Sequence, residues 1–96
     1  MRIEELLDNK REEILSIARK HGAQNVRVFG SVVRGEGGTG SDLDLLVEVG
    51  PEHTSFFPAG LVVDLEDLLG CKVDVVTEKA LHWYIRERVL KEAVPL

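Results

Sequence analysis

Three short segments of this chain alternate between polar and apolar residues, and each has one wholly apolar side. These segments are residues 25–29, 42–49 and 72–76. Successive side chains of a β-strand point to opposite faces, so each segment predicts a strand that buries one face. Stretches with the 3.6-residue period of a helix lie around them, at 3–21, 59–69 and 77–93. This order predicts an α/β (or α+β) fold, a small mixed sheet with helices over one face.

The ends of the predicted helices carry local signals. Lys10 falls in the middle of the apolar face of the first helix, which predicts that Asn9 caps a fresh helix and leaves residues 3–7 as a separate turn or bent extension. Gly22 is expected to end this helix in the left-handed conformation. Thr77 is expected to cap the last helix.

Size and composition predict a single domain covering residues 1–96. The chain has 96 residues, of which 44% are apolar and 30% are charged, as in an ordinary globular domain. No apolar run approaches the roughly 20 residues that span a bilayer, and no signal-peptide pattern opens the chain. A single cysteine, Cys71, fits a reducing cytoplasm. We therefore expect a cytoplasmic protein with no membrane partner.

The charge balance argues against nucleic acid as the main partner. Seventeen acidic and twelve basic residues give a net charge of −5. A protein that binds a polynucleotide backbone needs a basic surface to replace the counterions of the phosphates. An acidic chain of this size offers no such surface.

Three carboxylates are expected on the sheet face that the helices leave open. Asp42 and Asp44 are two residues apart on one strand, so their side chains leave the same face about 6–7 Å apart. Like charges this close repel unless a cation lies between them, and their oxygens suit Mg²⁺. Asp74 on a neighbouring strand would complete a site for two metal ions, as in phosphoryl-type displacement. The same face is expected to carry Arg27, Glu48 and Lys72. A solvated polar face is the alternative.

Gly30 and Ser31 end the first predicted strand and form a candidate phosphate-binding turn. Glycine lets the backbone approach a ligand closely, and the amides and hydroxyl at the start of a following helical turn can hold phosphate oxygens. The alternative is an ordinary strand-to-helix turn with Ser31 as its N-cap.

Arg34 and Ser41 flank the glycine-rich loop at residues 35–40. Arg34 could contact a triphosphate, or pair with Glu36 or Asp42. Ser41 could cap its own loop or add a hydroxyl to the site.

Aromatic residues and histidines leave further questions open. Residues 82–84, His-Trp-Tyr, could stack on a base or contact a partner, although packing of the last helix on the sheet is the simpler expectation. Phe56 and Phe57 face either the core or a contact surface, and with the unpaired sheet edges they make a homo-oligomer possible. The histidines at 21, 53 and 82 lack metal-ligand spacing and are expected to be unrelated surface residues.

The spacing between the Gly30-Ser31 turn and the two aspartates resembles the signature of a known protein family. Gly30-Ser31, ten intervening residues and then Asp42-Leu43-Asp44 closely resemble the Gly-Ser-x10-Asp-x-Asp signature of minimal nucleotidyltransferases in the DNA polymerase β superfamily. The likeness covers nearly all of residues 22–96. It continues through Ser41 and through segments 34–36, 45–48, 65–70, 73–77 and 85–88.

The resemblance implies specific roles for the candidate residues. Asp42 and Asp44 would hold two Mg²⁺ ions, and Asp74 would be a third metal ligand and a possible base toward the acceptor hydroxyl. Gly30 and Ser31 would grip the nucleotide triphosphate. The implied chemistry is in-line attack of a hydroxyl on the α-phosphorus with release of pyrophosphate.

The resemblance also implies a partner. Single-domain members are often antitoxins encoded beside a HEPN-domain ribonuclease toxin, in type VII-like toxin-antitoxin systems, and active ones transfer AMP from ATP to a tyrosine of that toxin. A chain of 96 residues without an acceptor-binding domain fits a protein acceptor. The alternatives are an antitoxin that neutralises its partner by occlusion, and transfer to a small molecule such as an aminoglycoside.

Overall fold

The computed structural model describes residues 3–34, 43–51 and 57–96, which form one four-stranded sheet with helices on both faces. The elements in chain order are α1 (Ile3–Lys20), β1 (Ala23–Phe29), a 3₁₀ turn (Gly30–Val32), β2 (Leu43–Val49), α2 (Ala59–Leu69), β3 (Val73–Thr77), a second 3₁₀ turn (Glu78–Ala80), α3 (Trp83–Glu92) and β4 (Val94–Pro95). The strand order is β3-β2-β1-β4, and the β2–β3 pair is parallel while the other two pairs are antiparallel. The sheet is therefore mixed, as predicted.

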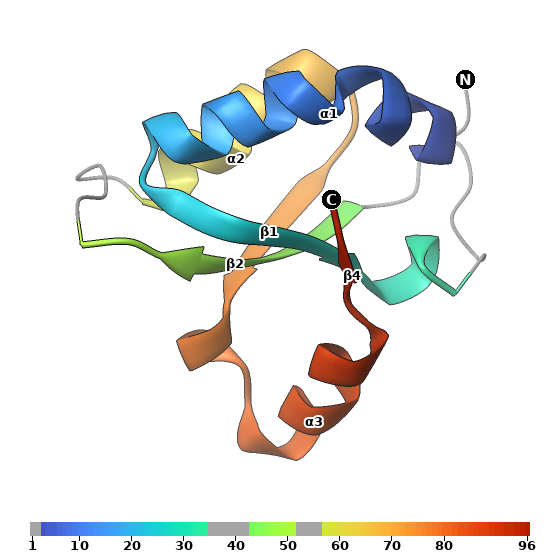
Figure 1. Ribbon diagram of the computed structural model, residues 1–96, viewed down its shortest axis with the longest axis vertical. Helices are drawn as coiled ribbons and strands as arrows, with labels where there is room; N and C mark the ends of the chain where they lie inside the picture. Colours follow the sequence, from blue (N-terminus) through green and yellow to red (C-terminus); the bar gives the residue numbers. More distant parts are fainter. Residues whose placement is uncertain (1–2, 35–42, 52–56) are drawn as a thin grey trace.

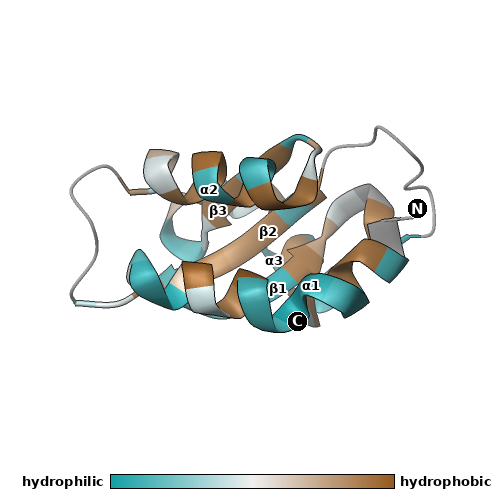
Figure 2. Cartoon of the chain, turned by 90° about the horizontal axis from the view of Figure 1, so that it is seen from above, coloured by the Kyte–Doolittle hydropathy of each residue, from teal (hydrophilic) through white to brown (hydrophobic). Residues whose placement is uncertain are grey.

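Helices α1 and α2 lie side by side over one face of the sheet (Figures 1 and 2). Both helices turn an apolar stripe toward the apolar sides of the strands, and burial of these side chains supplies most of the favourable free energy of folding. The residues that are at most 1% exposed in this layer include Ile14, Leu43, Leu45, Leu61 and Leu65. The predicted helix layer over one face is present.

Helix α3 lies over the opposite face, which the alternation pattern predicted to be open (Figure 1). Leu81 and Val89 pack there against Leu46, which is fully buried, and the half-buried Phe29 joins this second cluster. On this face of β2, Leu46 stands between Asp44 and Glu48. The polar groups of this face therefore lie at its two ends, and α3 packs between them.

The boundaries of α1 correct one prediction. The helix runs without interruption from Ile3 to Lys20, so the predicted break at Asn9 is wrong. The Lys10 side chain is 38% exposed and lies 3.7 Å from Glu13, so it reaches solvent from the edge of the apolar face. Gly22 has a φ of +85°, as expected of a glycine just past a helix end.

The C-terminal third departs most from the predicted boundaries. Thr77 caps the short 3₁₀ turn, accepting a hydrogen bond from the Ala80 N–H at 3.2 Å, and the long helix starts later. His82 caps α3, with its Nδ1 accepting from the Tyr84 N–H at 3.2 Å. After α3 the chain adds the unexpected strand β4, which pairs with Arg27 and Val28 of β1.

The aromatic and histidine predictions are partly wrong. Trp83 and Tyr84 are 79% and 77% exposed, so they do not pack α3 on the sheet. His21 is buried at 9% exposure, and its Nε2 lies 2.7 Å from Asp64 Oδ2, which joins the end of α1 to α2. Phe57 is half-buried against the main core. Phe56 and His53 lie outside the described residues.

Arg27 and Glu78 join β1 to the turn that precedes α3. Arg27 Nη1 lies 2.6 Å from Glu78 Oε1, and the Arg27 side chain is 11% exposed. Its Nε donates to the Asn25 carbonyl at 3.1 Å. Its Nη2 is buried and has no acceptor among the described residues. The Glu78 carboxylate is therefore the principal partner of a nearly buried charge.

Replacing Glu78 with alanine should lower the free energy of unfolding by about 2–3 kcal/mol, because the Arg27 guanidinium would be left without a carboxylate. Urea denaturation measures this. The matched control is Glu87→Ala on α3, whose 84% exposed side chain lies 3.3 Å from Lys91, and it should cost at most about 0.5 kcal/mol. Equal losses in the two variants would contradict a structural role for the Arg27–Glu78 pair.

No helix in the described part of the chain is long and apolar enough to cross a bilayer.

Candidate active site

The turn after β1 requires glycine at position 30. Gly30 is buried and has a φ of +83°, a conformation in which a side chain is strained. A Cβ added here would collide with Oδ2 of Asp44. Gly30 therefore allows the Asp44 carboxylate to lie directly against the backbone of the turn.

Asp44 and Asp74 meet across the parallel strands β2 and β3. They are register partners, so their Cα atoms are separated by one inter-strand spacing of about 5 Å and their side chains leave the same face. Asp44 is half-buried and Asp74 is exposed. The predicted juxtaposition of these two acids with Gly30 is present at the end of the sheet where β2 and β3 begin.

Several interactions fix the start of these two strands. The Leu43 N–H donates to the Lys72 carbonyl at 2.9 Å. The Val73 N–H donates to Oε2 of Glu66 on α2 at 3.0 Å. Because Leu43 precedes Asp44 and Val73 precedes Asp74, these bonds hold the backbone at both acids in register.

Other predicted site residues are only partly within the described chain. Asp42 and Ser41 lie outside the described residues, as does the glycine-rich loop. Ser31 occupies the middle of the 3₁₀ turn, and the structure describes its backbone only. The Arg34 side chain is 45% exposed, and its backbone N–H donates to the Gly30 carbonyl at 3.2 Å.

Glu92, the last residue of α3, contacts this turn and was not predicted. Its Oε2 accepts from the Gly30 N–H at 2.8 Å, and its Oε1 accepts from Arg34 Nη1 at 2.9 Å. The charges of the last helix predict only a solvated face, since nothing local marks a contact between positions 62 residues apart. The Gly30 amide that was expected to meet phosphate is thus engaged by a carboxylate of the chain itself.

The surroundings keep Glu92 charged. Burial by itself would raise the pKa of Glu92, but the hydrogen bonds from Gly30 and Arg34, together with the charges of Arg34 and Arg88, hold its pKa below the ordinary glutamate value. A carboxyl with a lowered pKa loses its charge only as the pH falls through that lowered value. Glu92 is therefore an anion at neutral pH.

The acids fit a site for Mg²⁺. Carboxylate oxygens are the ligands that this hard cation prefers, and Asp44 and Asp74 present theirs from adjacent strands. Within the described residues no group of three or more acidic, histidine or cysteine side chains is arranged so that it could hold a metal ion. Asp42, two positions before Asp44, supplies the third carboxylate of the predicted set.

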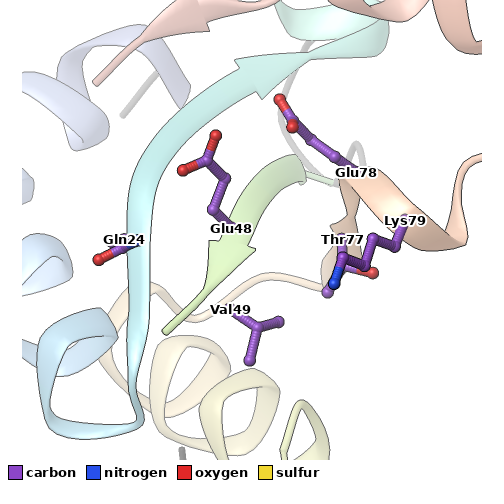
Figure 3. A pocket seen from close by; sticks show the side chains of 6 residues that line it. All are labelled: Gln24, Glu48, Val49, Thr77, Glu78 and Lys79. Atoms are coloured by element: carbon purple, nitrogen blue, oxygen red, sulfur yellow. The ribbon is translucent and has the colours of Figure 1, made fainter. Parts of the chain in front are cut away.

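A separate hollow lies at the opposite end of the same sheet (Figure 3). It has a volume of about 310 Å³ and is lined by Gln24, Glu48, Val49, Thr77, Glu78 and Lys79. Glu48 and Val49 end β2, whereas Asp44 is near its beginning. Of the polar groups expected beside the three acids, Glu48 lines this hollow and Arg27 pairs with Glu78. These groups are therefore separate from the candidate site.

Comparison with known proteins shows to which protein family the chain belongs. Residues 10–96 match the family model of the nucleotidyltransferase domain. The chain therefore belongs to the nucleotidyltransferase domain family and, within the DNA polymerase β superfamily, to the minimal nucleotidyltransferases, which confirms the predicted resemblance.

The relatives are similar over nearly their full length. The protein adenylyltransferase MntA of Thermococcus cleftensis is 38% identical over 91 residues, which are 86% of this chain and 92% of that protein. A predicted protein adenylyltransferase of Methanocaldococcus jannaschii is 38% identical over 84 residues, 88% of this chain and 90% of that one. A solved structure of a predicted minimal nucleotidyltransferase is 50% identical, with a TM-score of 0.85, and covers 100% of this chain and 97% of that one.

Two toxin-antitoxin structures share the fold at lower identity. A toxin-antitoxin crystallised with AMP-PNP is 21% identical, with a TM-score of 0.73, over 88% of this chain and 69% of that one. The MntA-HepT toxin-antitoxin is 18% identical, with a TM-score of 0.66, over 90% of this chain and 68% of that one. The predicted nucleotidyltransferase fold is confirmed.

Proposed function

We propose that this chain is a Mg²⁺-dependent protein adenylyltransferase that transfers AMP from ATP to a tyrosine hydroxyl of a HEPN-domain toxin. The observation that carries the proposal is the placement of Asp44 and Asp74 as register partners beside Gly30, whose missing side chain leaves room for the Asp44 carboxylate. The relatives that are named protein adenylyltransferases support the reaction class. The structures of toxin-antitoxin pairs support a toxin as acceptor.

In this proposal residues 1–96 act as one nucleotidyltransferase domain, and its three aspartates have defined roles. Asp42, Asp44 and Asp74 are the metal ligands and catalytic residues. These three residues would hold Mg²⁺, which when bound would supply the positive charge that phosphoryl-type displacement requires. Asp74 is exposed, so an acceptor hydroxyl brought by a partner can reach it, whereas Asp44 is held against the turn.

The nucleotide is held by Gly30, Ser31, Arg34 and Ser41. The Gly30 N–H already donates to Glu92, so Gly30 contributes to nucleotide binding by letting the backbone approach the ligand closely. Arg34 contributes positive charge from the end of the turn.

The reaction forms one bond and breaks one. The tyrosine oxygen attacks the α-phosphorus, and the new oxygen–phosphorus bond replaces the bond to the β-phosphate oxygen, so that pyrophosphate leaves. Asp74 accepts the phenolic proton.

Neutralisation by occlusion is a second candidate, because relatives with this fold crystallise together with their toxin. The two candidates separate in a growth assay in which the toxin is co-expressed with the wild type or with Asp44→Asn. Transfer predicts that Asp44→Asn loses neutralisation while it still accumulates to wild-type levels. Full neutralisation by that variant would overturn the enzymatic proposal in favour of occlusion.

A further inference from the structure

Glu92, the last residue of α3, contacts the candidate nucleotide-binding turn through its side chain. The helix packs on the sheet face opposite α1 and α2 (Figure 1). Its last residue contacts Gly30, which directly follows β1. The Glu92 side chain is 16% exposed, and its two oxygens accept from Gly30 and from Arg34. One carboxylate thus joins the backbone of the turn to the arginine that follows it.

The backbone on both sides anchors Glu92. Val89, one turn earlier, is 3% exposed in the cluster around Leu46, and its carbonyl accepts from the Ala93 N–H at 2.9 Å. Directly afterwards, Val94 pairs with Val28 of β1. The backbone at Glu92 is therefore held in place from both sides, and the two hydrogen bonds from Gly30 and Arg34 hold its carboxylate against the turn.

The Glu92 carboxylate could have either of two roles, and the two predict opposite effects of its removal on nucleotide affinity. A mobile carboxylate would compete with phosphate for the Gly30 amide, so its removal would strengthen nucleotide binding. A fixed carboxylate would orient the donors around it. A guanidinium is planar with its donors in a rigid fork, so one strong acceptor sets the direction of the others. The anchoring of Glu92 favours the fixed role.

We propose that Glu92 is a positioning residue for nucleotide binding: through its bonds to Gly30 and Arg34 it directs the Arg34 guanidinium at the triphosphate. The inference rests on the proposed function in that the ligand is a nucleoside triphosphate. It goes beyond that function in assigning to the end of α3 a role in nucleotide affinity.

The variant Glu92→Gln isolates the contribution of the Glu92 charge to nucleotide binding. Glutamine keeps the shape and one acceptor oxygen for the Gly30 N–H, but it removes the negative charge and places an N–H donor where Arg34 needs an acceptor. The dissociation constant for AMP-PNP with Mg²⁺ should rise about tenfold, and KM for ATP should rise similarly, while kcat changes by less than about twofold. Glu87→Gln on the exposed face of the same helix should change neither constant.

A double-mutant cycle tests whether Glu92 acts through Arg34. In an Arg34→Ala background, Glu92→Gln should weaken AMP-PNP binding no further. Tighter or unchanged binding by Glu92→Gln alone, or an equal loss with and without Arg34, would overturn the inference. Thermal melting and the amide NMR resonance of Gly30 in nucleotide-free protein report whether the variant is folded and whether the Gly30 contact persists.

The same binding assay separates this inference from the proposed function. If the wild type binds AMP-PNP but transfers nothing to a toxin, the proposed acceptor is wrong, and the affinities still decide the role of Glu92. If the wild type binds no nucleotide at all, both proposals fail.

Discussion

Replacing Asp44 with asparagine should reduce the rate of AMP transfer by about a thousandfold or more. In the proposed mechanism Asp44 is a metal ligand, and loss of such a carboxylate removes several kcal/mol of transition-state stabilisation; each 1.4 kcal/mol is about tenfold in rate. Asparagine has nearly the same shape, so it still fits against Gly30 and the fold should be retained. Single-turnover kinetics with labelled ATP and the acceptor protein measure the loss.

A matched control for this variant is Asp67→Asn. Asp67 is an exposed aspartate on α2, on the far side of the sheet from the acids, and the same chemical change there should leave the transfer rate within about twofold. Equal rates for Asp44→Asn and the wild type, at equal folded fractions, would show that Asp44 takes no part in the reaction.

Replacing Gly30 with alanine should abolish transfer and also destabilise the fold. The φ of +83° costs a residue with a side chain about 1–2 kcal/mol, and the new Cβ collides with the Asp44 carboxylate. Asp44 must then move away from its place opposite Asp74. We expect a loss of activity as large as that of Asp44→Asn, measured in the same kinetic assay.

Gly70 provides the control that separates backbone strain from the collision. Its φ is +69°, and apart from its two chain neighbours no atom of the described residues lies within 4 Å of an added Cβ. Gly70→Ala should therefore cost about 1 kcal/mol of stability and leave transfer unchanged. If the two glycine variants were equally active, the close approach of Asp44 to the turn would have no functional meaning.

Features that depend on local periodicity could be predicted from the sequence. Helix α2 has the predicted bounds, because leucines recur at helical spacing and Gly70 follows directly. The placement of Asp44 beside Asp74 follows from strand alternation, which requires only that the two strands be neighbours and in register. The sequence predicted Asp74 on a neighbouring strand, and the parallel pairing of β2 with β3 confirms this.

Features that depend on contacts between distant segments could not be predicted. Strand β4 has two residues, one of them proline, and it exists because α3 returns the chain to β1. Thr77 gave a genuine capping signal, but for a 3₁₀ turn of three residues. The role of Glu92 is visible only once the packing of Val89 beneath the sheet places the end of α3 against Gly30.

The central claim is that the acids beside Gly30 transfer AMP to a protein. The direct measurement is incubation of the chain with Mg²⁺, a HEPN-domain toxin partner and ATP labelled in either the α- or the γ-phosphate. The account predicts that the toxin becomes labelled from α-labelled ATP and not from γ-labelled ATP, that a tyrosine carries the AMP, and that Asp44→Asn abolishes the label. An unlabelled toxin, or equal labelling by the wild type and Asp44→Asn, would contradict it.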